Sequence, residues 1–144
     1  MTQPSRVVYW DASAILSLLF ADCHSSTALA YRQRAGAVHL LSTLAYVETC
    51  AVIARLVREK ALSIALAKEA QHHLAVWPWR RTTVQPAWEI IGALAEHWPL
   101  RGTDLWHLAC AVNLRRQLPE LHLLTFDSRL LEAARGERLL DLED

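Results

Sequence analysis

The chain has 144 residues, of which 53% are hydrophobic and 21% charged, and its 15 basic residues balance its 15 acidic ones. This length and composition are typical of one globular domain and exclude a disordered chain. The zero net charge excludes a protein that binds nucleic acid through an overall basic surface, so any affinity for a polyanion must come from local arginines or from bound metal.

Apolar strand-like runs alternate with helical patterns along the chain. Ser42 or Thr43 is expected to cap one helix, and Ser63 the next. The first half is expected to contain a strand at 6–10, helices at 12–20 and 25–34, a strand at 37–41, and helices from 43 to about 60 and from 63 to about 76.

The second half is interrupted by prolines. Residues 77–84 are ambiguous because they contain Pro78, and they are compatible with a short strand. Pro86 fits the first turn of a helix that ends near Trp98. Thr103 is expected to cap a further helix. The remaining elements are that helix at 104–117, a strand at 122–126, a short helix at 128–134 and a candidate edge strand at 139–142.

Strands separated by helices predict parallel pairing with right-handed crossovers. The strand runs are almost continuously apolar, as expected when helices cover both faces of a sheet. We therefore expect a single domain over residues 1–144, with a three-layer α/β/α architecture and a mainly parallel sheet of about five strands. Such sheets bind ligands beyond the carboxyl ends of their strands.

Four acidic residues occupy positions next to core segments. Asp11 and Asp127 each follow an apolar strand run, Glu48 lies inside a helical pattern, and Asp104 opens a helix. Carboxylates in such places have a desolvation cost that something must offset. Mutually repelling carboxylates are most simply explained by divalent cations, and oxygen ligands without a His/Cys cluster favour Mg²⁺ or Mn²⁺ over Zn²⁺.

Small hydroxyl residues flank every one of these acids, and they can orient carboxylates. They are Ser13, Thr49, Thr103, Thr125 and Ser128.

Each acid taken alone also has a plainer interpretation. Asp11 and Asp127 are suited to capping the helices that follow them. Asp104 is suited to the positive end of a helix dipole, and Glu48 to a partly exposed position paired with Arg55 or Arg58. The joint pattern is what favours a metal-dependent hydrolase of phosphodiesters.

At these residues the chain resembles the PIN-domain nucleases, in particular the VapC toxins of bacterial toxin–antitoxin systems. The resemblance covers essentially the whole chain, and the matching segments are 9–15, 46–48, 100–109 and 124–130.

The resemblance implies that Asp11, Glu48, Asp104 and Asp127 bind the metal, with Ser13 and Thr125 matching the family's small hydroxyl positions. It also implies RNA cleavage with Mg²⁺ or Mn²⁺, products with a 5′-phosphate and a 3′-hydroxyl, a homodimer, and a small antitoxin partner. A non-toxin RNA-processing nuclease, or an inactive PIN-like module that binds RNA or protein, is the alternative.

Three arginines are candidate substrate contacts. Arg101 precedes Asp104 by three residues, and Arg80 and Arg81 follow the aromatic segment 77–79. Single-strand binders mix aromatic and basic groups in this way, but core or dimer-interface tryptophans are the favoured interpretation of the aromatic positions. His107 is expected to be a core histidine or a neighbour of a metal ligand.

Several other classes of protein are disfavoured. No apolar run approaches the ~20 residues of a membrane span, and residues 1–6 precede no secretory segment, so we expect a cytoplasmic protein. The three cysteines are far apart and indicate neither a zinc site nor a disulfide framework. Haloacid-dehalogenase phosphotransferases need a second Asp two residues after the first, where this chain has Ser13.

Overall fold

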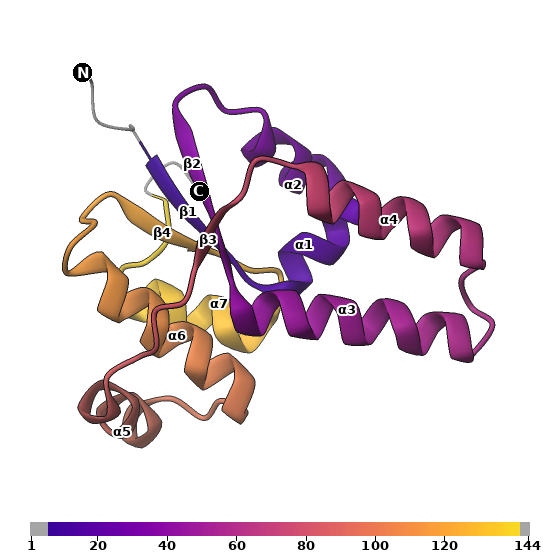
Figure 1. The fold of residues 1–144 in the computed structure, drawn as a ribbon. Helices are drawn as coiled ribbons and strands as arrows, with labels where there is room; N and C mark the ends of the chain where they lie inside the picture. The colour runs from indigo at the N-terminus through magenta and orange to yellow at the C-terminus, as the bar shows by residue number, and fades with distance from the viewer. Residues whose placement is uncertain (1–5, 142–144) are drawn as a thin grey trace.

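The computed structural model describes residues 6–141 and contains a parallel sheet with helices on both faces (Figure 1). The four strands lie in the order β3-β2-β1-β4 and all pair in parallel. They are β1 (Arg6–Trp10), β2 (Ala37–Ser42), β3 (Arg80–Thr82) and β4 (Leu121–Leu124). The helices are α1 (Ala12–Leu19), α2 (Ser25–Arg32), α3 (Thr43–Arg58), α4 (Ile64–Val76), α5 (Trp88–His97), α6 (Gly102–Arg115) and α7 (Ser128–Gly136).

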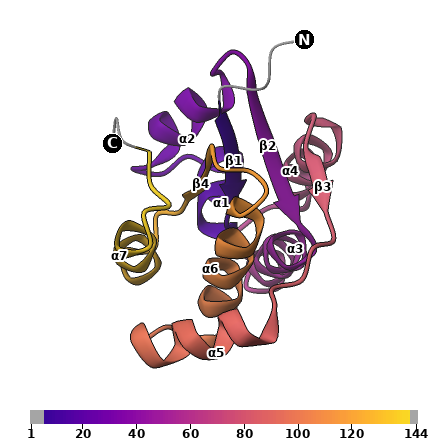
Figure 2. The same ribbon diagram turned by 90° about the vertical axis from the view of Figure 1, so that its left-hand side faces the viewer.

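The alternation of side chains along β1 separates two cores. Val7 and Tyr9 pack with α5, α6 and α7, whereas Val8 and Trp10 pack with α1, α2, α3 and α4. Figures 1 and 2 show α3 and α4 extending as a pair on one side, while α5 lies beyond α6 on the other. The three-layer α/β/α architecture is therefore confirmed.

The starts of α3 and α4 follow from capping by serine. The Ser42 hydroxyl accepts the Ala45 N–H at 3.1 Å, and the Ser63 hydroxyl accepts the Leu66 N–H at 3.2 Å. Ser42, and not Thr43, is thus the cap residue of α3. None of the helices in the described part of the chain has the length and apolarity that crossing a membrane requires.

Two expected helix starts are wrong. Helix α6 begins at Gly102 after the extended residue Arg101, so Thr103 lies inside the first turn and does not cap it. Helix α5 begins at Trp88 after Ala87, so Pro86 precedes the helix. In both cases the residue before the helix gives no side-chain cap, and a motif search based on caps therefore misplaces the first turn.

Between residues 6 and 141 the sheet has four strands, where about five were expected. Residues 139–141 of the candidate edge strand are not in the sheet, and Leu142 lies outside the described residues. The Leu123 N–H donates to the Leu139 carbonyl at 2.8 Å. Arg138 has a left-handed φ of 58°, which turns the chain out of α7 and buries Leu139 in the core. The strand expected at 122–126 ends earlier, at Leu124.

Aromatic residues fill the core beside α4. Trp10, Trp77 and Trp79 meet edge to face, with ring centroids 4.2 to 5.7 Å apart. The interpretation of Trp77 and Trp79 as core residues is confirmed. Trp98 packs on the other core and donates to Glu137 at 3.0 Å, whereas Trp88 is 87% exposed.

His39 lies within this aromatic core and makes folding dependent on pH. The Trp10 indole N–H donates to Nδ1 of His39 at 2.9 Å, which fixes a neutral ring. Burial lowers the pKa of His39 to about 4, so the unfolded chain takes up a proton between about pH 6.5 and 4 that the folded chain does not. The contribution of His39 to the free energy of unfolding is therefore fully present above about pH 6.5 and is lost as the pH falls toward 4.

The expected loss in the free energy of unfolding is about 2 kcal/mol. A pKa shift of this size corresponds to about 3 kcal/mol, and solvent screening reduces that value. Urea unfolding at pH 7 and pH 5 measures it, and His39→Gln should abolish His39's contribution to the loss while exposed His72→Gln keeps it. An equal loss in wild type and His39→Gln would assign the pH dependence to other groups.

Candidate active site

The carboxyl edge of the sheet brings Asp11 and Asp127 to one place. Asp11 directly follows β1 and is buried, and its N–H donates to the Leu124 carbonyl of β4 at 3.2 Å. Strand β4 ends at Leu124, so Thr125 is the first residue beyond it and Asp127 the third. The Thr125 hydroxyl donates to Oδ2 of Asp11 at 2.5 Å and accepts the Asp127 N–H at 3.1 Å, so it joins the two acids.

The Asp11 carboxylate is held on both oxygens. Oδ1 accepts the Ser13 hydroxyl at 2.7 Å and the Ala14 N–H at 2.9 Å, while Thr125 occupies Oδ2. Burial raises the pKa of Asp11, against the lowering effect of the bonds from Thr125, Ser13 and Ala14. The carboxylate is thus fixed in direction but incompletely compensated, and a nearby positive charge would stabilise it.

Asp127 caps α7 with one oxygen only. Its Oδ1 accepts the N–H groups of Arg129 and Leu130, each at 3.0 Å. Within residues 6–141, Oδ2 accepts no hydrogen bond and is available to a ligand. The capping interpretation is therefore correct for both Asp11 and Asp127, and capping leaves their site role open.

Glu48 reaches across from α3 to α6. Its Oε1 accepts Nε2–H of His107 at 2.5 Å, and Nδ1 of His107 lies 2.6 Å from the Tyr9 hydroxyl. Burial raises the pKa of Tyr9 well above its usual value, so the hydroxyl keeps its proton and donates to Nδ1. This chain of hydrogen bonds fixes the Glu48 carboxylate.

Within residues 6–141 Glu48 forms no ion pair with Arg55 or Arg58, so the expected pairing is wrong; Nε of Arg55 lies 4.0 Å from Oε1 of Glu59 instead. Among the hydroxyls that flank the acids, within residues 6–141, only Ser13 and Thr125 donate to a site carboxylate. Thr49 instead donates to the Ala45 carbonyl at 2.8 Å.

Asp104 lies in the first turn of α6 and responds to the other acids. Burial raises its pKa, and the charges of Asp127 and Glu48 raise it further, whereas His107 and Arg101 oppose the shift. Charge interactions thus link Asp104 to Asp127 and to Glu48, and the Thr125 hydroxyl joins Asp127 to Asp11.

The donor set fits a hard divalent cation in its chemistry. All four groups are carboxylates, which Mg²⁺ and Mn²⁺ prefer, and a cation would relieve the repulsion at Asp104. As the side chains stand, no three His, Cys, Asp or Glu residues between 6 and 141 are grouped closely enough to hold a metal ion. A metal ion at this site would therefore require some side-chain movement.

A family model described as the PIN domain matches residues 8–136. The chain belongs to the PIN-domain family. Members of this family are generally nucleases, and they generally use divalent metal ions. This membership confirms the resemblance drawn from the four acidic segments.

Two solved structures share the PIN fold. PAE2754 from Pyrobaculum aerophilum is 17% identical with a TM-score of 0.61, and the match covers 92% of this chain and 82% of that one. VapC20 from Mycobacterium tuberculosis, a toxin that cleaves the sarcin-ricin loop, is 16% identical with a TM-score of 0.59, and the match covers 88% and 94% of the two chains. No curated protein matches the chain.

A stacked pair of rings borders the acidic site of this PIN domain. His24 lies parallel to Phe126, with centroids 4.4 Å apart and planes within 5°. The Phe126 N–H donates to the Ser13 hydroxyl at 3.0 Å, which ties the pair to Asp11. Asp22 accepts the His24 N–H at 2.8 Å. Sequence reasoning missed this contact, because nothing in the local pattern links positions 24 and 126.

The three candidate arginines lie in different places. Arg101 is exposed at the start of α6, close enough to Asp104 to lower its pKa against the dominant effect of burial. Arg80 pairs with Leu40 and Arg81 with Leu41, and these two leucines belong to opposite cores. Arg80 and Arg81 therefore point to opposite faces of the sheet.

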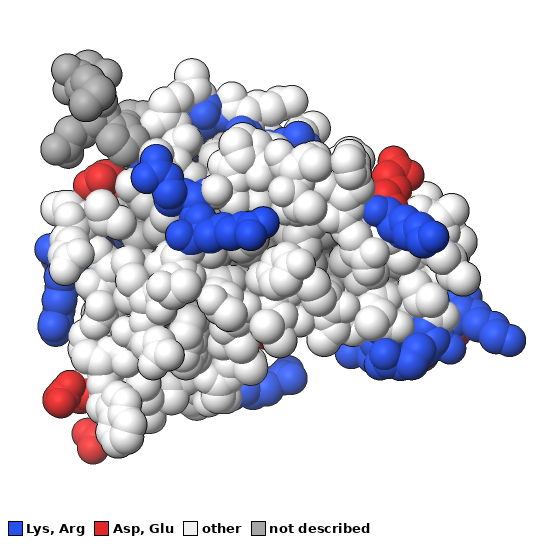
Figure 3. All heavy atoms as spheres, in the orientation of Figure 1, with Lys and Arg blue, Asp and Glu red and all other residues white. Residues whose placement is uncertain are grey.

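The face seen in Figure 3 is largely uncharged. Its Lys and Arg side chains are spread over separate places, and no continuous basic surface covers it. This distribution agrees with the zero net charge and leaves local groups to attract a polyanion.

Proposed function

We propose that this PIN domain is a Mg²⁺- or Mn²⁺-dependent endoribonuclease. The observation that supports the proposal is the buried Asp11 carboxylate, held by Ser13 and Thr125, beside the mutually interacting charges of Asp104, Asp127 and Glu48. A protein that only needed to cap helices would gain nothing from burying Asp11 and raising its pKa.

Each residue has a distinct task in the proposed reaction. Asp11, Glu48, Asp104 and Asp127 would hold the metal, which when bound supplies charge stabilisation for phosphodiester hydrolysis. Ser13 and Thr125 fix the direction of Asp11, and His107 fixes Glu48. Arg101, exposed beside Asp104, is suited to contact a phosphate of the RNA by its planar guanidinium.

We further propose that the nuclease acts as the toxin of a toxin–antitoxin pair. The likeness of fold to VapC20, itself a toxin, supports this role. The proposed partners are the RNA substrate, a small antitoxin protein and a second copy of the chain in a homodimer, acting in the cytoplasm.

Metal removal tests the nuclease directly. Wild-type protein should degrade a structured RNA with Mg²⁺ or Mn²⁺ and lose that activity in EDTA, with recovery when the metal is restored. Cleavage that continues unchanged in EDTA would contradict the metal dependence. Binding of RNA without any cleavage would favour the alternative of an inactive PIN-like module.

Expression in a bacterial host separates a toxin from an RNA-processing nuclease. A toxin should arrest growth, and co-expression of the product of the neighbouring gene should relieve the arrest. A catalytically active protein that leaves growth unaffected would favour the processing role.

A further inference from the structure

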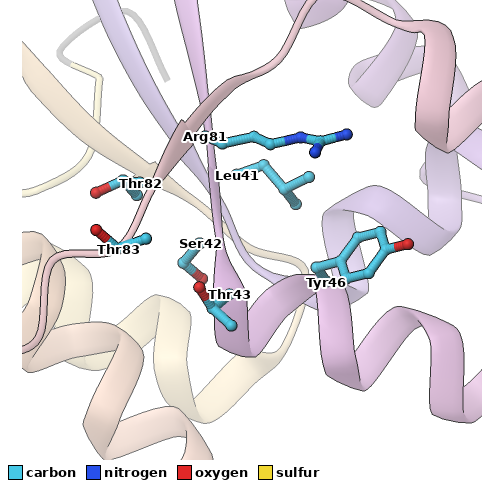
Figure 4. A pocket seen from close by; sticks show the side chains of 7 residues that line it. All are labelled: Leu41, Ser42, Thr43, Tyr46, Arg81, Thr82 and Thr83. Atoms are coloured by element: carbon cyan, nitrogen blue, oxygen red, sulfur yellow. The ribbon is translucent and has the colours of Figure 1, made fainter.

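A pocket opens at the carboxyl edge between β2, β3 and the start of α3 (Figure 4). Its volume is about 210 Å³. It is lined by Leu41, Ser42, Thr43, Tyr46, Arg81, Thr82 and Thr83. These residues supply a mainly apolar wall, several hydroxyls, one aromatic ring and one cation, which is a combination suited to a base and a phosphate.

Arg81 supplies the cation. It is exposed, and among residues 6–141 no carboxylate forms an ion pair with it. In Figure 4 its side chain runs over Leu41 toward the side of the pocket where Tyr46 stands. A planar guanidinium without an acidic partner is suited to bidentate contact with a phosphate.

Tyr46 supplies the aromatic surface. Tyr46 is 44% exposed on α3, where it is one of the few large apolar residues that face solvent. An exposed ring beside an arginine is a typical stacking surface for an unpaired base. Leu41, at the end of β2, provides the apolar floor beneath.

The pocket lies on the same edge of the sheet as the carboxylates. β2 separates β3 from β1, whose carboxyl end carries Asp11. With about 4.8 Å between strands, the pocket lies about 5 to 10 Å along the edge from the end of β1. Thr43, at the start of α3, is exposed and lines the pocket at this edge.

We propose that this pocket binds a nucleotide of the RNA close to the scissile phosphate, with the base against Tyr46 and a phosphate on Arg81. The inference rests on the proposed function and makes the pocket a determinant of cleavage position. Arg81, and not the adjacent Arg80, is then the substrate contact on β3, because only Arg81 lines the pocket.

The test measures binding of a fluorescein-labelled single-stranded RNA by anisotropy, with Ca²⁺ in place of Mg²⁺ and the RNA checked for integrity. Arg81→Ala should raise Kd about tenfold and lower the slope of log Kd against log salt by about 0.7. Tyr46→Ala should raise Kd about tenfold through lost stacking. Tyr46→Phe, which keeps the ring, and Arg80→Ala, which removes the same charge next door, should change Kd less than about twofold.

Three outcomes overturn the inference. The first is an unchanged Kd for Arg81→Ala, and the second is an equal rise in Kd for Arg80→Ala. The third is a change of molar mass by light scattering in the Arg81 or Tyr46 variant, which would assign the pocket to a second copy of the chain. Cleavage by wild type with Mg²⁺ is measured separately. If wild type cleaves RNA but Arg81→Ala binds it with an unchanged Kd, the pocket inference alone is refuted. If the variants change Kd as expected but wild type does not cleave, the proposed activity alone is refuted.

Discussion

Replacement of Asp11 with asparagine should abolish RNA cleavage with Mg²⁺ or Mn²⁺, lowering the rate by about a thousandfold or more. The loss follows because Asp11 is the most firmly held of the four carboxylates, and its charge is what a divalent cation would bind. Metal ions contribute several kcal/mol to such reactions, and about 4 kcal/mol corresponds to a thousandfold. Cleavage of a labelled RNA under single-turnover conditions measures the effect.

The same variant should fold normally. Asparagine caps helices as well as aspartate does. Its side-chain amide can donate a hydrogen bond to the oxygen of the Thr125 hydroxyl, because a hydroxyl can accept as well as donate. Because burial raises the pKa of Asp11, removal of its charge should leave the melting temperature in EDTA unchanged or higher. The matched control is Glu89→Gln, which removes an exposed carboxylate in α5 and should keep full activity. An active Asp11→Asn enzyme would refute the proposed site.

Replacement of His107 with leucine should lower cleavage by about 10- to 100-fold and raise the Mn²⁺ concentration for half-maximal activity. Partners that orient metal ligands typically have effects of this size, and His107 is the group that fixes Glu48. The variant also leaves the buried Tyr9 hydroxyl without its partner, at a cost of about 1–3 kcal/mol in stability.

Two further variants separate positioning from folding. His107→Gln, whose amide can still donate toward Glu48, should recover part of the metal affinity. Tyr9→Phe removes the far end of the hydrogen-bond chain and leaves the His107–Glu48 bond in place, so the metal requirement should change little. If all three variants lose activity in proportion to their stability, with the same metal requirement, His107 is a structural residue only.

The fold was predictable because its signals are local. The continuous apolar runs of β1 and β4 indicated buried parallel strands, and Ser42 and Ser63 marked helix starts that the structure confirms. The errors occurred where the local signal was weak. Arg101 and Ala87 precede their helices without a side-chain cap. The run at 139–142 was apolar because Leu139 fills the core, not because it extends the sheet.

The sequence indicated the acids of the candidate site and the hydroxyls of Ser13 and Thr125 beside Asp11, but not the long-range bonds of His107. Asp11 and Asp127 stand out because a carboxylate after a buried strand is costly without a compensating partner. The bond between His107 and Glu48 joins residues 59 apart, and that between His107 and Tyr9 joins residues 98 apart. Periodicity within a helix indicates which face is buried, but it does not indicate which distant side chain lies against that face.

The sequence by itself determined the α/β layering and identified the four acidic residues as candidates. Both follow from short segments, because apolar patterns and charges next to them can be recognised locally. Only the tertiary structure decided how those carboxylates are held and where a pocket opens on the surface. Thr125 reaches Asp11 across 114 positions, and the pocket forms where β2, β3 and α3 meet. Such contacts depend on strand order and crossover geometry, which set the distances between segments that the chain itself keeps far apart.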